Sequence, residues 1–248
     1  MQEAVIGSRE GHPGLQLARV ADELAGMISR QQGVIDETVR LDELHSSSGK
    51  WGRAQLMSLR DLTTAERTLV EETGRLIEKL SAAEVFALAL RGAARHMQRA
   101  IDLLAQRDTG RQTQKAETDA RKRLADLVEA LKPDEPARHD DERQDDLQLG
   151  GSGKQQGSPP GDGIPTLAQV KMLITLQKEL FVRTAEIEKR RGKDGLLRQA
   201  ARDELDAVAR EQGELADLAR NLSAVSSVPD NEDDADGTPN EEEKTKPE

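Results

Sequence analysis

The sequence predicts an all-α fold in which long amphipathic helices form a coiled coil or a helical bundle. The main observation is a spacing shared by three stretches around Thr38, Thr73 and Thr184. Apolar residues recur 14, 11, 4 and 3 residues before each threonine and 3 residues after it. This alternation of three and four places the apolar side chains on one helix face. The second observation is that 33% of the residues are charged and 1% are aromatic, which leaves few large side chains for a thick core.

The three stretches also share a register of polar residues. With each threonine at heptad position a, an amide or carboxyl side chain takes the preceding a position, and apolar residues fill positions d and e. A stripe this wide is typical of bundles of three or more helices, and polar residues at position a fix which layers meet. We expect the threonine layers to pair with one another or with the same layer of a second copy; alternatively, threonine is simply tolerated at the stripe edge. The predicted interaction residues are Gln31, Thr38, Glu66, Thr73, Gln177, Phe181 and Thr184.

The N-terminal half is predicted to be one helical coiled-coil or bundle region, residues 14–132, after a disordered segment of residues 1–13. We expect helices over residues 15–45 and 52–80, then a third helix from residue 81 to the break at residues 108–110. Residues 63–66 resemble a capping box, but the apolar stripe continues through them, so they are predicted to be helix interior. Ser81 and Glu84 form a better capping box. A polar stretch, residues 112–122, precedes a last apolar face over residues 124–131.

The C-terminal half is predicted to be an antiparallel helical hairpin, residues 165–225, between two disordered segments. Residues 133–164 form a linker that is first acidic and then rich in glycine and proline, a composition that buries too little apolar surface to fold. Thr166 and Gln169 form a capping box for the first helix of the hairpin, and Asp194 is expected to cap the second. Residues 226–248 form a disordered acidic tail.

The net charge of −11 is concentrated in two segments. Residues 134–146 carry −5 and residues 229–248 carry −7, which leaves +1 for the rest of the chain. A nucleic-acid-binding protein is expected to present a basic face and aromatic stacking platforms, and this chain offers neither. Nucleic acid is therefore not an expected partner.

The sequence contains no pattern that predicts catalysis. It has no cysteine, its four histidines show no metal-ligand spacing, and the HExxH, GxSxG and GxGxxG motifs do not occur. Residues 150–154 fail as a phosphate-binding loop because Gln155 follows the lysine and Gln148 replaces the leading glycine. The acidic tail from Glu232 to Glu243 follows part of a calcium-loop spacing, but Pro239 in its centre argues against a site. We therefore expect a protein that is not an enzyme, with no cofactor and no metal.

No stretch reaches the length of about 18 apolar residues typical of a membrane-spanning helix, and the first thirty residues lack the apolar core of a signal peptide. As written, the chain is expected to be cytoplasmic. If its N-terminus is incomplete, an exported or membrane-associated protein is the alternative.

Two stretches resemble a family of uncharacterised, helix-rich coiled-coil proteins of planctomycete-type bacteria. The residues that carry the resemblance are Met97, Leu103, Leu104, Asp108, Thr109, Gly110, Thr113, Gln114, Leu124, Leu127, Val128 and Leu131, then Ile164, Pro165, Thr166, Leu167, Lys171, Leu173, Leu176, Gln177 and Thr184. The resemblance covers about residues 80–190 and implies no assigned activity. Members of that family commonly begin with a signal or membrane segment, which this chain lacks.

These observations favour a non-enzymatic scaffold or adaptor that acts through helix association, with helices of a second copy or of a partner coiled coil. One alternative is a regulatory subunit that docks on a basic partner through its acidic linker or tail. Another is a coiled-coil protein at a membrane surface.

Overall fold

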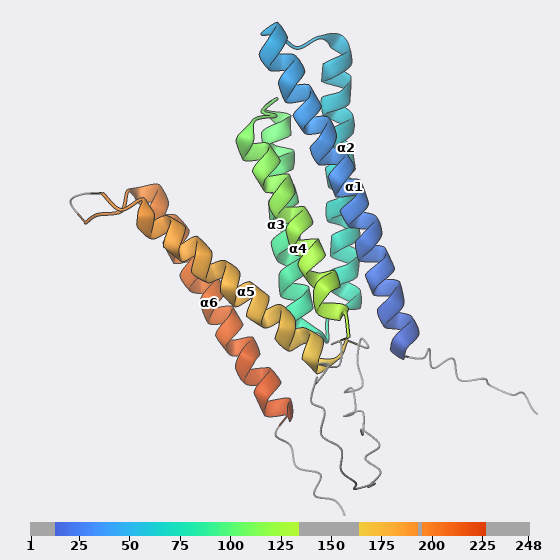
Figure 1. The fold of residues 1–248 in the computed structure, drawn as a ribbon, viewed down its shortest axis with the longest axis vertical. Helices are drawn as coiled ribbons and strands as arrows, with labels where there is room; N and C mark the ends of the chain where they lie inside the picture. Colours follow the sequence, from blue (N-terminus) through green and yellow to red (C-terminus); the bar gives the residue numbers. More distant parts are fainter. Residues whose placement is uncertain (1–12, 134–163, 193–194, 227–248) are drawn as a thin grey trace, which may run out of the picture.

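The computed structural model describes residues 13–133, 164–192 and 195–226, and these residues contain helices and no strands. The all-α prediction is confirmed. The helices are α1 (Pro13–Ser48), α2 (Arg53–Lys79), α3 (Glu84–Ala105), α4 (Arg111–Leu131), α5 (Thr166–Lys189) and α6 (Gln199–Ser226) (Figure 1).

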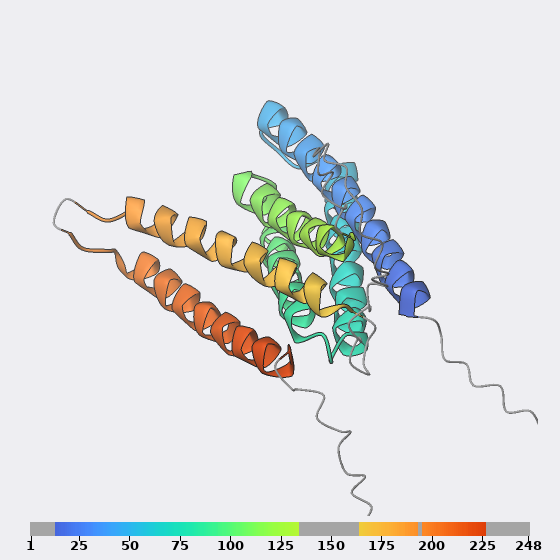
Figure 2. The ribbon, with the colours of Figure 1, turned by 60° about the horizontal axis from the view of Figure 1, so that its bottom comes forward.

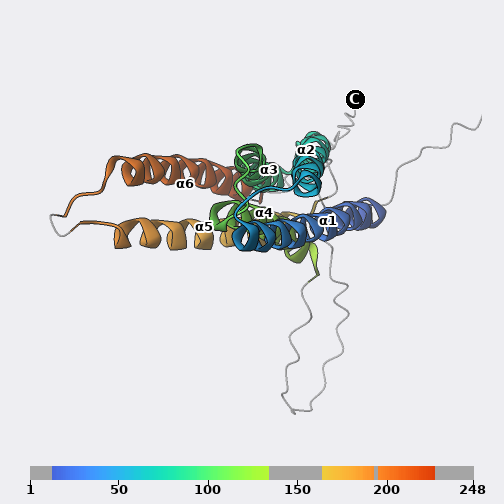
Figure 3. The same ribbon diagram turned by 90° about the horizontal axis from the view of Figure 1, so that it is seen from above.

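Helices α1 to α4 form an antiparallel four-helix bundle, in which α3 packs on α2 and α4, and α1 packs closely on α4 and less extensively on α2. Helices α5 and α6 form an antiparallel hairpin that packs against α3 and α4. The hairpin diverges from the bundle, so that its tip lies away from the other helices (Figures 2 and 3). The two ends of the hairpin that lie near the bundle are the start of α5 and the end of α6.

Buried apolar side chains form two clusters. The larger cluster lies at the start of α1 and the end of α2, and it continues through α3 and α4 into the interface with the hairpin. The smaller cluster lies at the end of α1 and the start of α2. The smaller cluster consists of Val34, Leu41, Leu59, Leu62 and Leu104, with Trp51 and Leu56 packed against it. Trp51 also stacks on the His45 ring at a centroid distance of 4.1 Å, so it covers the α1–α2 connection.

The predicted apolar stripe is largely the buried face of the bundle. All six d positions of the first two stretches are buried: Met27, Val34, Leu41, Leu62, Leu69 and Leu76. In the third stretch, Leu180 and Ile187 are buried, whereas Ile174 and Phe181 at position e are exposed. Helix α2 continues through residues 63–66, so the interpretation of these residues as helix interior is confirmed.

Two predicted capping boxes are wrong. Helix α3 begins at Glu84 and α5 at Thr166, with Ala83 and Pro165 as N-caps and no side-chain cap bond at either end. A capping box needs its Ser or Thr in the N-cap position itself, and here Ser81 precedes that position whereas Thr166 follows it. Asp194 lies outside the described residues.

Helix α4 begins at Arg111, so the polar stretch of residues 112–122 is helical. Its buried face consists of small and polar side chains, which an apolar period does not reveal: Thr113, Ala116, Glu117 and Ala120. Small side chains let α4 approach α1 and α3 closely. The segments predicted to be disordered lie almost entirely outside the described residues, and the weighed calcium-loop and phosphate-loop patterns lie there as well.

Candidate functional site

Two pairs of buried polar side chains join α1 to its neighbours inside the bundle. Gln31 of α1 donates a hydrogen bond from Nε2 to Oε1 of Glu66 on α2 at 2.6 Å. Thr38, two turns along α1, donates from Oγ1 to Oε1 of Glu117 on α4 at 2.8 Å. All four residues have no solvent-exposed surface. We call these four residues the polar layer.

The polar layer interrupts the apolar face of α1. The larger cluster includes Met27 on one side of Gln31, and the smaller cluster begins with Val34 on the other. Helix α3 completes this part of the core with apolar residues only, including Met97, Ala100 and Ile101. The two glutamic acids are thus enclosed by hydrocarbon and by the side chains of α1.

The hydrogen bonds of the polar layer are incomplete. One oxygen of each carboxyl group, Oε2 of Glu66 and of Glu117, is buried without a partner, and so is Oε1 of Gln31. Burial raises the pKa of Glu66 to about 7, and the hydrogen bond from Gln31, which lowers the pKa, offsets only part of this rise. Burial also raises the pKa of Glu117 to about 8; the Thr38 hydrogen bond lowers it and the charge of Glu66 raises it further. A neutral carboxyl group carries a proton that can satisfy one of these oxygens.

The structure brings together only some of the predicted interaction residues. Gln31 and Glu66, which occupy the same heptad position in the predicted register, are hydrogen-bonded. The three threonines are not bonded to one another: Thr38 reaches Glu117, whereas Thr73 and Thr184 donate to the carbonyl oxygens of their own helices at Leu69 and Leu180. Because α1 and α2 are antiparallel, Thr38 and Thr73 lie on opposite sides of the Gln31–Glu66 pair along the bundle. The two threonines are therefore too far apart to pair.

Glu117 is the functional candidate that the sequence interpretation missed. It lies in a stretch where acidic, basic and amide side chains alternate, and nothing in the chain pattern distinguishes it from its exposed neighbours. The only signal is positional, because Thr113, Ala116, Ala120 and Leu124 share a helix face with it.

Helix α5 carries an exposed apolar stripe, which we call the α5 stripe: Leu167, Val170, Ile174 and Phe181. Leu167, Ile174 and Phe181 are seven residues apart and are 55%, 48% and 74% exposed. Gln177 turns from this stripe toward α6, where it exchanges two hydrogen bonds with Gln212 at 3.0 and 3.2 Å. Phe181, a predicted interaction residue, is therefore free on the surface, whereas Gln177 joins the two helices of the hairpin.

Ion pairs fix α5 on the bundle and so determine where the stripe faces. Arg123 of α4 is only 3% exposed and donates to Glu179 of α5 at 2.7 Å. Glu211 of α6 pairs with Arg183 of α5 at 2.7 Å and lies 3.8 Å from Arg95 of α3. The stripe lies on the side of α5 that these contacts leave uncovered.

His96 of α3 lies among these charged side chains and is half-buried. Burial lowers its pKa to about 4; the Asp119 charge opposes this shift, and the Arg123 charge adds to it. His96 is therefore neutral at physiological pH. No described carboxylate is hydrogen-bonded to it, so it lacks the orienting partner of a catalytic histidine.

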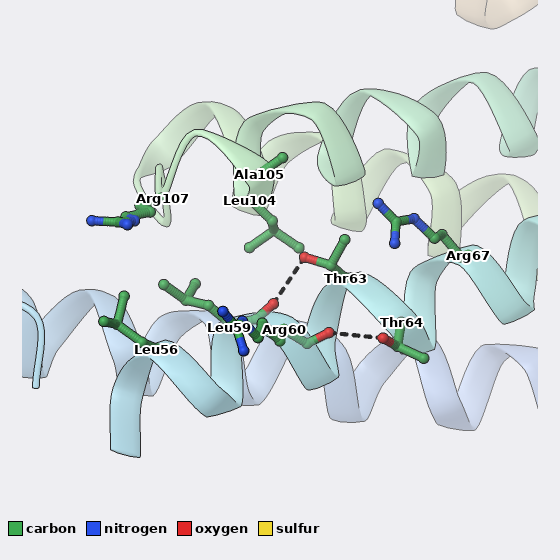
Figure 4. A pocket seen from close by; sticks show the side chains of 9 residues that line it. All are labelled: Leu56, Leu59, Arg60, Thr63, Thr64, Arg67, Leu104, Ala105 and Arg107. Carbon is green, nitrogen blue, oxygen red and sulfur yellow. Dashed lines mark hydrogen bonds between the residues drawn. The ribbon is translucent and has the colours of Figure 1, made fainter. Parts of the chain in front are cut away.

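A surface pocket of about 500 Å³ lies between α2 and the end of α3 (Figure 4). Its hydroxyl groups are already used, since Thr63 and Thr64 donate to the carbonyl oxygens of Leu59 and Arg60 at 2.8 and 2.9 Å. Its three arginines, at positions 60, 67 and 107, lie apart along the pocket in Figure 4. The lining thus contains no nucleophile paired with a base.

Neither known proteins nor metal-ligand geometry assigns a function to this chain. Comparison with protein-family models, with curated proteins and with solved structures gave no match. Within residues 13–133, 164–192 and 195–226, no three histidine or acidic side chains gather as metal ligands would. None of the helices in these ranges has the length and apolar character that crossing a membrane requires. By its fold, the chain is an all-α helical bundle protein.

Proposed function

We propose that the protein is a non-enzymatic scaffold or adaptor that associates with other helices through the α5 stripe. The observation that supports this proposal is the row of exposed Leu167, Ile174 and Phe181 on the face of α5 that the bundle leaves uncovered. Apolar residues that are grouped on a protein surface often mark an interaction site, whereas single exposed apolar residues are common on any protein. Burying a side chain of this size contributes about 1.5–3 kcal/mol, so the row could support a specific contact.

The first partner we propose is a second copy of the chain. The seven-residue spacing is symmetric about Ile174, so two antiparallel α5 helices would place Phe181 of one copy against Leu167 of the other. Self-complementarity of this kind is what a two-fold interface requires. A seven-residue spacing is also the spacing of a helix–helix seam.

Light scattering after size-exclusion chromatography tests this proposal on the full chain. We expect the native protein to dimerise and Phe181→Glu or Ile174→Glu to be monomeric and still helical by circular dichroism. Met57→Glu is the matched control, because Met57 is 58% exposed on α2 and does not belong to the stripe. A native protein that stays monomeric at high concentration would contradict self-association, and binding of another helical protein that Phe181→Glu abolishes would redirect the proposal to an adaptor role.

A second candidate function uses the acidic segments. Residues 134–146 and 229–248 carry most of the net charge, and a basic protein surface would attract them. Deletion of residues 229–248 separates the two functions, since self-association through α5 should survive and a salt-sensitive basic partner should be lost. Flotation with anionic liposomes tests the further alternative of a membrane surface.

A further inference from the structure

The polar layer connects α1 to α2 and α4 by buried hydrogen bonds to two glutamic acids. Among the described residues, the only buried polar side chains of α1 are Gln31 and Thr38, and each is hydrogen-bonded to a glutamic acid. One acid is on α2 and the other on α4. The other polar contacts between α1 and α2 lie at the surface and contribute little. They include the ion pairs Arg30–Glu72 and Glu23–Lys79 and a hydrogen bond between Glu37 and Ser58.

No cation faces the two acids. Helix α1 presents the neutral Gln31 and Thr38 to them, and the buried residues of α3 are all apolar or glycine. On α4, Arg121 lies one turn beyond Glu117, and its Nε is buried without a hydrogen-bond partner. Arg123, the buried cation of α4, is paired with Glu179 of α5 instead.

An ionised carboxylate in such a place is unfavourable, because burial removes its hydration and nothing replaces it. The three unpartnered buried oxygens, on Gln31, Glu66 and Glu117, are all acceptors. Protons on the two acids would turn two of them into donors and leave the Gln31 oxygen as an acceptor. With one of these donors on the Gln31 oxygen, fewer buried polar atoms lack a partner when both acids are neutral than when both are ionised.

We propose that the polar layer is a proton-controlled lock on α1: the bundle is closed while Glu66 and Glu117 hold their protons, and loss of these protons frees α1 from α2 and α4. On ionisation, Glu66 must reach water through the loosely packed α1–α2 side, and Glu117 can turn toward Arg121, its neighbour on the same helix. Both movements break a buried hydrogen bond of α1. Release of α1 would expose the apolar face that includes Leu24, Met27 and Leu41.

Hydrogen exchange of the full-length protein, measured by mass spectrometry and corrected for the intrinsic exchange rate, tests the lock. Between about pH 6 and about pH 9, we expect the protection of α1 amides to fall roughly tenfold or more relative to the protection of α3 amides. The double variant Glu66→Gln/Glu117→Gln keeps uncharged side chains of the same size and should lose this pH response. Glu43→Gln, on the exposed face of α1, is the control and should retain it.

The single variants Glu66→Gln and Glu117→Gln each remove part of the response, and they serve if the double variant does not fold. The lock is refuted if α1 and α3 keep a constant ratio of protection across this pH range. It is also refuted if both helices lose protection together, or if the glutamine variants respond as the native protein does.

Discussion

Gln31 donates a 2.6 Å hydrogen bond to Glu66 across the α1–α2 pair, and neither side chain reaches solvent. This contact sets the register of the first two helices, because a shift by one turn of either helix would place a polar group of the pair in hydrocarbon. It also holds a carboxyl group where ionisation is costly. The stability of the bundle is therefore expected to depend on pH.

The pKa values give the sign of that dependence. Glu66 and Glu117 have pKa values of about 7 and about 8 in the folded protein, against 4.5 for an ordinary glutamic acid. The folded state binds these protons more tightly, so their contribution is complete below about pH 4.5 and is lost as the pH rises to about 8. The loss at Glu66 alone is on the order of 3 kcal/mol.

Urea unfolding at a series of pH values measures this loss. The glutamine double variant should show a much flatter profile than the native protein between about pH 5 and pH 8. A native free energy of unfolding that stays constant or rises over this range would contradict the expected protonation of the polar layer.

Removing Glu179 should destabilise the packing of the hairpin on the bundle. Glu179→Ala leaves the guanidinium of Arg123, which is 3% exposed, without its partner, and an uncompensated buried charge costs several kcal/mol. Since Glu179 is itself partly exposed, we expect a loss of about 2 kcal/mol in urea unfolding. Asp217→Ala removes the exposed pair with Arg220 and should change stability by less than about 0.5 kcal/mol. Equal effects of the two substitutions would show that the Arg123 pair is not specially buried.

Gly92→Ala should also destabilise the protein, through the same arginine. A methyl group at position 92 would lie 3.3 Å from both Cζ and Nη1 of Arg123, which is held by its ion pair and cannot move freely. We expect a loss of about 1 kcal/mol, because this crowding outweighs the helix propensity of alanine. Gly26→Ala is the matched control: nothing lies within 4 Å of its added methyl group, so the substitution should stabilise the helix by about 0.5–1 kcal/mol. Stabilisation by both substitutions, measured by thermal unfolding, would contradict the close contact.

The two phenylalanines should have opposite roles. Phe86 is fully buried in the larger cluster, so Phe86→Ala should cost about 3–5 kcal/mol of stability. Phe181 is 74% exposed, so Phe181→Ala should leave unfolding of the monomer nearly unchanged and weaken self-association instead. Denaturation and light scattering on both variants check this pair of outcomes, and a stability loss in Phe181→Ala similar to that in Phe86→Ala would be against it.

The sequence was sufficient to predict the all-α fold and the buried face of α1 and α2, because a three-four period records which side chains face the core. It gave Gln31 and Glu66 the same heptad position, but it predicted that the threonines would pair, because residue spacing does not show how two antiparallel helices are aligned. It could not place Glu117, because α4 buries small and polar residues that resemble its exposed ones. It assigned two capping boxes that do not form, because a capping motif depends on backbone dihedral angles that residue types alone do not determine.

The protonation of the polar layer can be measured most directly by the carbon-13 NMR shifts of the Glu66 and Glu117 carboxyl groups during a pH titration. We expect these two groups to titrate near pH 7 and pH 8, well above the exposed glutamic acids of the same chain. Titration of both groups near 4.5, together with those exposed glutamic acids, would contradict a buried layer of neutral acids inside the bundle.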